Sequence, residues 1–255
     1  MDKIRNSLLA ALPRACYEKL LPALVPVVLV FGDILYEPGK PMRDVYFPVN
    51  CLVSLLTLVE GHLALEVGMV GREGMVGVAL ALGIKDSPMR ALVQGAGPAL
   101  RMSAARFSRE LGRSPSLRRG INGYIHVLMG QISQTAACNR FHNVEARLAR
   151  WLLMTRDRMG VPQFRMTQDF LASMLGVRRV GVTESASALQ RRNLIEYHRG
   201  SIHILDQGGL EAAACSCYSP PPYAARPGGP GAAQLKVKLA ADPAEHGTEA
   251  ALAVF

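Results

Sequence analysis

Residues 166–190 place basic and hydroxyl side chains where they could contact a nucleic acid. Gly176 follows an apolar helical segment and can adopt the positive φ of a tight turn between two helices. A second helix is predicted from about 178 to 191, with its apolar side directed inward. Guanidinium groups match guanine edges and phosphates, so this helix-turn-helix pattern predicts a second helix that enters the DNA major groove. Its exposed first turns would present Arg178, Arg179 and Thr183.

A predicted β-hairpin follows this helix pair directly. Two alternating segments within residues 193–205 flank Arg199-Gly200, which is a turn signal. A hairpin in this position is typical of a winged helix-turn-helix domain. The alternative is a small helical bundle with a hairpin and no ligand.

The elements that position these residues change in character along the chain. Residues 4–24 carry apolar side chains at helical spacing and predict one or two short helices. Short strand-like runs separated by Gly and Pro turn signals then favour a barrel, sandwich or jelly roll. The strand candidates are 44–47, 52–58, 63–69 and 91–101, and turn signals include Glu60-Gly61-His62.

Two helices are expected between residues 104 and 159. Ser114-Pro115 can begin the first of them, which would run to about Cys138. The stripe on this helix suits packing either on a partner chain or on the chain's own barrel. The stripe consists of Leu117, Ile121, Tyr124, Leu128, Ile132 and Thr135. A second, Arg-rich helix is expected over about 143–159, with Trp151, Leu152 and Leu153 directed inward.

Composition and charge narrow the class of protein. The chain has 255 residues, 49% of them apolar, which is enough for a core and excludes wholesale disorder. No apolar run reaches the roughly 20 residues of a membrane span, and no signal peptide is visible. The formal charge is +9, and residues 140–206 contribute 11 Arg against 6 acidic residues. That excess of Arg fits a polyanionic partner, although many proteins are basic without one.

The sequence resembles the Crp/Fnr family of bacterial transcription regulators over residues 25–217. The segments that carry the resemblance are LYEPGKPMRDVYFP (35–48), EVGMVGREGMVG (66–77), SPMRALVQ (87–94), QTAACNRFHNVEARLARWLL (134–153) and TQDFLASMLGVRRVGVT (167–183). The resemblance implies an α+β fold in which a jelly-roll-like β-roll, related to cyclic-nucleotide-binding domains, precedes a dimerisation helix and a winged helix-turn-helix. The expected regions are N-terminal helices (1–24), β-roll sensor (25–113), dimerisation helix (114–139), DNA-binding domain (140–217) and a disordered Pro/Gly/Ala-rich tail (218–255).

The resemblance also implies roles for individual side chains. The family's main guanine-reading Arg falls on Arg179, its partner Glu falls on Val180, and a second reading Arg falls on Glu184. Glu184 could accept a hydrogen bond from a cytosine amine or remain solvated, so a different preferred sequence is expected. The residues expected to contact phosphates, or else to be solvated, are Thr167, Gln168, Arg191 and Arg199.

The expected β-roll lacks part of the cyclic-nucleotide signature. Arg90 matches the phosphate-binding Arg, but Ala91 replaces the following hydroxyl residue. Gly77-Val78 stands where a ribose-binding Gly-Glu pair would be expected. Cyclic AMP is therefore doubtful, and Arg90 and Gly77 are candidates for an unknown effector. Arg90 could instead pair with a nearby carboxylate.

The cysteines predict a reduced, cytoplasmic protein without a cofactor or metal. Five Cys lack framework spacing, and an iron–sulfur cluster would need about four suitably placed Cys. Cys215-Ser-Cys217 reads as a two-thiol pair with no further ligand nearby, and Cys138 as a small buried apolar residue.

The favoured function is a homodimeric regulator that binds double-stranded DNA at a palindromic site, with RNA polymerase as a further partner and no membrane partner. One alternative is a ligand-binding or interaction module whose DNA reader has degenerated, as the unusual tail suggests. A remote alternative is a jelly-roll metal enzyme, in which His62 and Glu66 would share a strand face. Two ligands rarely hold a catalytic metal, so no enzyme is expected.

Overall fold

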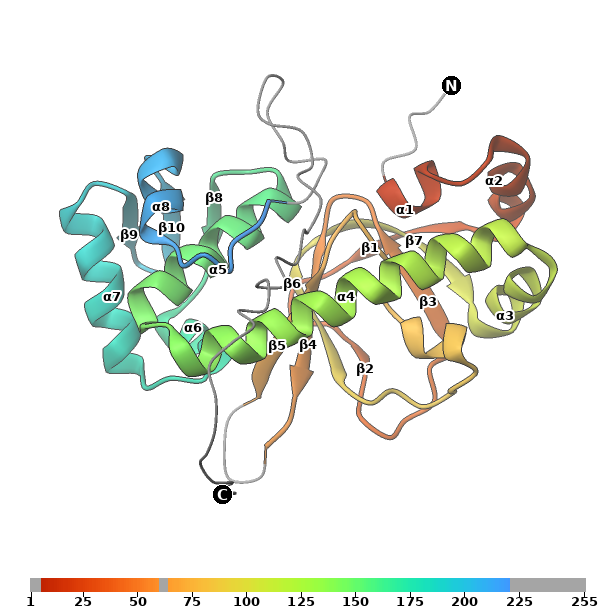
Figure 1. Ribbon diagram of the computed structural model, residues 1–255, viewed down its shortest axis with the longest axis horizontal. Coiled ribbons are helices and arrows are strands. Elements are labelled where there is room, and N and C mark those ends of the chain that lie inside the picture. The colour runs from red at the N-terminus through yellow and green to blue at the C-terminus, as the bar shows by residue number, and fades with distance from the viewer. Residues whose placement is uncertain (1–5, 60–63, 221–255) are drawn as a thin grey trace, which may run out of the picture. The chain divides into compact units, whose positions relative to one another are not determined.

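The computed structural model describes residues 6–59 and 64–220 (Figure 1). Residues 1–5, the expected turn at 60–62 with His62, and residues 221–255 of the expected tail lie outside this range. The chain begins with helices α1 (Ser7–Ala10) and α2 (Arg14–Leu20) and the 3-10 turn η1 (Leu21–Ala23). Of the one or two short helices expected, two form, and Pro13 separates them as the N-cap of α2.

In the described part of the β-roll, seven strands form two antiparallel sheets that enclose one apolar core. One sheet has the order β1-β7-β3 and the other β2-β6-β4-β5. The strands are β1 (Val25–Leu29), β2 (Ile34–Tyr36), β3 (Asp44–Pro48), β4 (Leu52–Thr57), β5 (Leu65–Val70), β6 (Arg90–Gly95) and β7 (Gly97–Ser103), with the 3-10 helix η2 (Val78–Leu82) after β5. The core between them includes Val45, Phe47, Val53, Met75 and Met102.

The single strand expected over 91–101 is wrong, because the chain turns sharply at Gly95–Gly97. Strands β6 and β7 belong to different sheets. Gly97 has φ +157°, and a Cβ there would overlap the carbonyl oxygen of Asn50. Only glycine fits that close approach of two backbones, so the apolar run is divided between the two sheets.

The long helix packs on its own β-roll. Helix α3 (Ala104–Arg113) leads into α4 (Pro115–Phe141), whose N-cap Ser114 accepts a hydrogen bond from the Leu117 amide at 3.2 Å. Four members of the expected stripe are buried in the core of the β-roll and a fifth packs against it: Leu117, Ile121, Tyr124, Leu128 and Ile132. The stripe is therefore intramolecular, and the opposite side of α4 is left for any partner.

The C-terminal region is a three-stranded winged helix-turn-helix. It comprises α5 (Val144–Met159), β8 (Gln163–Arg165), α6 (Gln168–Leu175), α7 (Arg179–Arg191), β9 (Ile195–His198), β10 (Ser201–Ile204) and α8 (Gln207–Ala213). The wing sheet has the order β8-β10-β9, so the expected hairpin gains a third strand. Trp151, Leu152 and Leu153 are buried in its core, as predicted. The α+β fold is confirmed.

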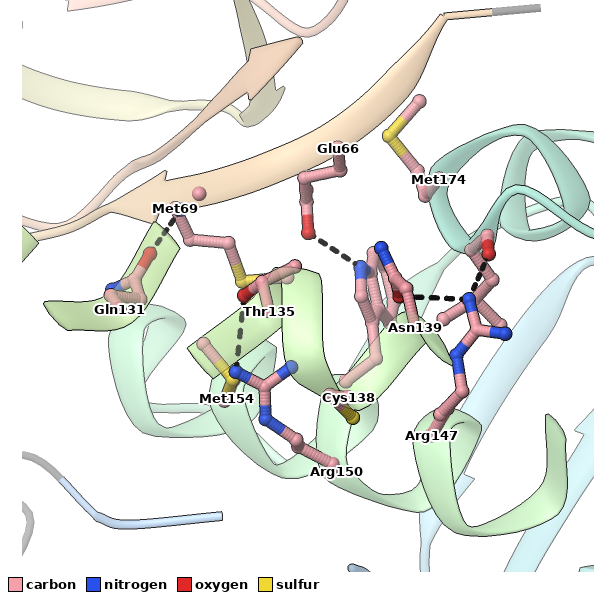
Figure 2. Close-up of a pocket in the computed structure, with 13 residues that line it drawn as sticks. Glu66, Met69, Gln131, Thr135, Cys138, Asn139, Arg147, Arg150, Met154 and Met174 are labelled. Carbon is pink, nitrogen blue, oxygen red and sulfur yellow. Dashed lines mark hydrogen bonds between the residues drawn. The ribbon is translucent and has the colours of Figure 1, made fainter. Parts of the chain in front are cut away.

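Helix α5 joins this region to the β-roll through polar side chains as well as apolar ones. Trp151 Nε1 donates to Glu66 Oε1 at 2.9 Å, and Ser54 donates to Glu66 Oε2 at 2.6 Å. The adjoining cavity, which Glu66, Thr135, Arg147 and other residues line, encloses about 20 Å³ (Figure 2). That volume suits one water molecule, so this joint is a packed interface and not an effector pocket.

Glu66 makes the stability of this joint depend on pH. Complete burial raises the pKa of Glu66 to about 7, although the Ser54 and Trp151 hydrogen bonds oppose the shift. The unfolded chain ionises this carboxyl near pH 4.5, so the folded state loses stability as pH rises from about 5 to 8. The expected loss is on the order of 3 kcal/mol.

Glu66→Gln is neutral at every pH and is expected to remove that loss. Urea unfolding should show the variant gaining stability over the wild type between pH 5 and pH 8. Parallel stability profiles for the two proteins would show that Glu66 does not titrate in this range.

Among the helices within 6–59 and 64–220, none combines the length and apolar character that spanning a bilayer demands.

Candidate nucleic-acid interface

The two helices of the turn are set by local signals. Thr167 caps α6 by accepting a hydrogen bond from the Phe170 amide at 3.2 Å. Gly176 ends α6 with φ +61°, where a side chain would be strained. Val182, Ala186 and Leu189 bury one side of α7 in the domain core. The other side of α7 is consequently directed to solvent.

The exposed side of α7 carries the residues predicted to read bases. Arg178 is the N-cap of α7 and Arg179 its first helical residue, with the Arg179 side chain 65% exposed. Val180 is 59% exposed, and Thr183 and Glu184 are exposed one turn further on. These five side chains therefore occupy the start of one accessible helix face, the placement that the sequence predicts.

Two contacts between α6 and α7 orient this face. Arg179 Nε lies 3.5 Å from Asp169 Oδ1, and Thr183 Oγ1 donates to Gln168 Oε1 at 2.8 Å. Both pairs are exposed, so such contacts contribute little to stability. They orient the Arg179 and Thr183 side chains in the free protein. Because these contacts are weak, the two side chains remain available for other partners.

The wing brings a basic turn beside the cap of α6. Arg199 has φ +48° and Gly200 φ +77° at the tip between β9 and β10. The Met166 amide donates to the Gly200 carbonyl at 2.7 Å, and Tyr197 Oη donates to the Met166 carbonyl at 2.7 Å. The structure thus brings Arg199 and Thr167 to the same region, while exposed Arg191 lies at the far end of α7.

Several of the Arg residues in 140–206 make contacts inside the protein and are not available to a polyanionic partner. Arg147, Arg150 and Arg158 are all buried on α5. Arg147 donates to Asn139 Oδ1 at 2.9 Å and to the Leu175 carbonyl, so it links α4 and α6. The charge argument from sequence could not separate these internal guanidinium groups from the exposed ones on α7.

The effector candidates in the β-roll have local structural roles. Arg90 Nε lies 3.0 Å from Glu37 Oε2, which is the carboxylate pairing that the sequence left open. Gly77 has φ +102° at the start of η2, and a Cβ there would lie 2.7 Å from Tyr36 Oη. An anion bound at Arg90 would lie beside the Glu37 carboxylate, whose negative charge disfavours it.

The expectation that Cys215 and Cys217 have no further ligand nearby is wrong. The fold brings them to Cys138 and His142 at the end of α4, within 4.8 Å between ligand atoms. Cys138 is buried, as predicted, but it adjoins these groups instead of serving only as an apolar residue. The one sequence signal was the spacing of Cys138 and His142, which puts both on one side of a helix.

Comparison with known proteins agrees with this geometry. Residues 146–213 match the family model of the Crp-like helix-turn-helix domain. No curated protein matches the chain in sequence.

Solved structures share the fold over most of the chain. FixK2 from Bradyrhizobium japonicum has a TM-score of 0.65 at 13% identity, covering 76% of this chain and 98% of its own. A CRP-family transcriptional regulator from Thermus thermophilus has a TM-score of 0.64 at 18% identity, covering 76% and 100%. The c-di-GMP responsive global regulator CLP of Xanthomonas campestris has 0.63 at 16%, covering 76% and 100%.

These matches bear on the classes of function that the sequence left open. The match to a Crp-like helix-turn-helix domain favours a DNA-binding protein over the jelly-roll metal enzyme. The family model covers the helix-turn-helix, and the shared fold covers the β-roll and α4 as well. Residues 146–213 therefore form a Crp-like helix-turn-helix domain, and the chain as a whole has the fold of solved Crp/Fnr-family structures.

Proposed function

We propose that the protein is a homodimer that binds a palindromic DNA site sequence-specifically, under the control of a signal other than cyclic AMP. The observation that carries this proposal is the solvent-exposed start of α7, where guanidinium, methyl, hydroxyl and carboxylate groups lie on one face. That mixture offers hydrogen-bond donors, an acceptor and an apolar surface to base edges, which electrostatic attraction alone would not require.

Each side chain of this face has a distinct role in the proposal. Arg179 donates to a guanine, with Arg178 beside it, and Glu184 accepts from a cytosine amine. Val180 meets a thymine methyl group, because its exposed side chain offers no hydrogen bond. Thr183 contacts a base edge once its hydroxyl leaves Gln168. The groups proposed for phosphate contacts are Thr167, Gln168 and Arg199, close to the start of α7, and Arg191 at its far end.

The proposed dimer uses the side of α4 that faces away from the β-roll. Val127 and Met129, which are 61% and 63% exposed, flank this side on its two edges. A Cβ on Gly123 or Gly130 would meet no atom within 4 Å, so close approach of a second helix is sterically open. A parallel second copy across this face would place two reading helices about one DNA turn apart.

The proposal also concerns the effector site in the β-roll and the partners other than DNA. A small-molecule effector acting at Arg90 and Gly77 would meet the Glu37 carboxylate beside the guanidinium, and the site lacks a ribose-binding Glu. The proposal includes RNA polymerase as a further partner and the cytoplasm as the location, where a bacterial regulator reaches its DNA. The competing proposal, an interaction module with a degenerate reader, requires that α7 no longer distinguishes sequences.

Selection of duplexes from a random DNA pool tests the proposal. Full-length protein without added ligand is expected to enrich a palindrome whose half-sites lie one turn apart. Salt-sensitive binding with no enriched sequence, both alone and with a metabolite extract, would favour the degenerate reader.

Arg179→Ala is expected to weaken binding to the selected site by about 1–3 kcal/mol and to relax the preference for one base pair. The reason is loss of a bidentate contact to guanine, and competition binding with single-position variants of the site measures it. Arg109→Ala, at an exposed residue of α3, is the matched control and should leave binding unchanged. Equal losses on specific and random duplexes would make Arg179 a phosphate contact.

A further inference from the structure

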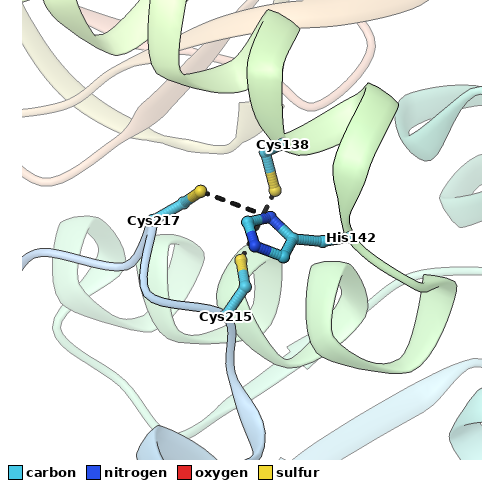
Figure 3. Close-up of side chains that lie close together, drawn as sticks. All are labelled: Cys138, His142, Cys215 and Cys217. Carbon is cyan, nitrogen blue, oxygen red and sulfur yellow. Dashed lines mark hydrogen bonds between the residues drawn. The ribbon is translucent and has the colours of Figure 1, made fainter. Parts of the chain in front are cut away.

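Four potential metal ligands meet where α4 ends (Figure 3). They are the thiols of Cys138, Cys215 and Cys217 and the imidazole of His142, and their ligand atoms all lie within 4.8 Å of one another. Cys138 Sγ lies 3.4 Å from Cys215 Sγ, and Cys217 Sγ lies 3.4 Å from His142 Nδ1. Residues 77 positions apart thus converge on one point.

These separations match the edges of a tetrahedral zinc site. Zn–S bonds of about 2.3 Å and Zn–N bonds of about 2.0–2.1 Å give edges of about 3.8 Å between sulfurs and about 3.5 Å between sulfur and nitrogen. The two distances of 3.4 Å and the upper bound of 4.8 Å enclose those values. Small rotations of the four side chains, which move the ligand atoms by about 1 Å or less, would complete the tetrahedron.

The donors come from two segments whose backbones are already held. Cys138 and His142 are one helical turn apart, and the His142 amide still donates to the Cys138 carbonyl at 3.1 Å. Cys215 and Cys217 lie on a turn closed by the Tyr218 amide, which donates to the Cys215 carbonyl at 2.9 Å. Tyr218 Oη donates to Asp157 Oδ2 at 2.8 Å and fastens that turn to α5.

The surroundings suit a site with three thiolates. Gln134 Nε2 donates to Cys217 Sγ at 2.9 Å, and Arg150 Nε donates to the Cys217 carbonyl at 3.3 Å. The positive charges of Arg147 and Arg150 act on Cys138 and offset the net negative charge of a Zn²⁺ ion bound by three thiolates. Such outer hydrogen bonds and charges orient ligands and strengthen metal binding.

We propose that Cys138, His142, Cys215 and Cys217 form a structural Zn²⁺ site. Soft thiolates with one imidazole favour Zn²⁺ over Mg²⁺ or Ca²⁺, and four protein ligands leave no open position for catalysis. Binding releases the three thiol protons to solvent and changes no oxidation state. The ion would clamp the segment after α8 to the α4–α5 junction, which lies between the β-roll and the DNA-reading helices.

Metal content of the full-length protein, purified with a reductant and without chelator, is the primary test. One zinc ion per chain is expected by native mass spectrometry and elemental analysis. Replacement by Co²⁺ should give the intense visible bands of tetrahedral cobalt and a thiolate charge-transfer band. These readouts involve no DNA, so they stand apart from the proposed function.

Variants assign the ligands. Cys217→Ser and His142→Ala are expected to lower zinc affinity at least tenfold and to weaken the cobalt spectrum. His142→Cys should retain one ion with a stronger charge-transfer band. Cys16→Ser is the matched control, because Cys16 is half-buried away from the cluster and its thiol contacts Ser114.

Three results would overturn the proposal. They are a metal-free chain after equilibration with buffered zinc, a cobalt spectrum unchanged by Cys217→Ser while circular dichroism shows a folded variant, and a Cys138–Cys215 disulfide that forms under the same reducing conditions in place of metal binding.

Discussion

Gly74→Ala is expected to destabilise the protein by about 4 kcal/mol, because the new methyl group would occupy the space of the Tyr124 ring. Tyr124 is buried on the side of α4 that packs on the β-roll. The backbone at Gly74 cannot easily move away, since the buried Asn6 Nδ2 donates to its carbonyl at 2.9 Å. Thermal and urea unfolding measure the effect.

Two further variants separate this steric effect from the general effect of alanine. Gly112→Ala in α3 meets no atom within 4 Å and should be neutral or slightly stabilising, because alanine favours a helix. In a Tyr124→Ala background the space is vacant, so Gly74→Ala should then cost less than about 1 kcal/mol. An equal cost in both backgrounds would show that the methyl group does not meet the ring.

Arg158→Ala is expected to cost about 3–5 kcal/mol, because it removes one partner of a buried ion pair between α5 and the β-roll. Arg158 Nε lies 2.7 Å from Glu73 Oε1, and the Arg158 side chain is only 6% exposed. Arg158 Nη1 also donates to the Met154 carbonyl at 3.1 Å. Its aliphatic part fits over Gly71, where a Cβ would lie 2.8 Å from Arg158 Cγ.

The comparison with an exposed pair shows whether burial is the cause. Arg14 Nε lies 2.7 Å from Glu18 Oε1, and both side chains are exposed on α2. Arg14→Ala should therefore not measurably change stability. Joint replacement by Arg158→Met and Glu73→Gln should recover much of the loss, since no buried charge then lacks an opposite charge. A small cost for Arg158→Ala alone would mean that solvent reaches this joint.

Short-range signals determined much of this protein from its sequence. A glycine able to adopt positive φ and the apolar helix faces predicted α6, the turn and α7, because each depends on residues a few positions apart. The accessible start of α7 with Arg178 and Arg179 followed from the same periodicity. The resemblance to Crp/Fnr regulators then connected these elements into one fold, and the family model and shared folds support it.

Only the tertiary structure decided which helix faces and side chains contact one another. Periodicity showed that α4 has an apolar stripe. The stripe packs on the β-roll because its side chains complete the apolar core there. The buried Arg of α5 and the exposed Arg of α7 look alike in sequence, since burial depends on distant partners such as Asn139 and Glu73. The same holds for Cys138, His142, Cys215 and Cys217, which become one cluster only when α8 returns the chain to the end of α4. Local patterns specify helices and turns through neighbouring residues, whereas sites built across long sequence separations exist only after the chain has folded.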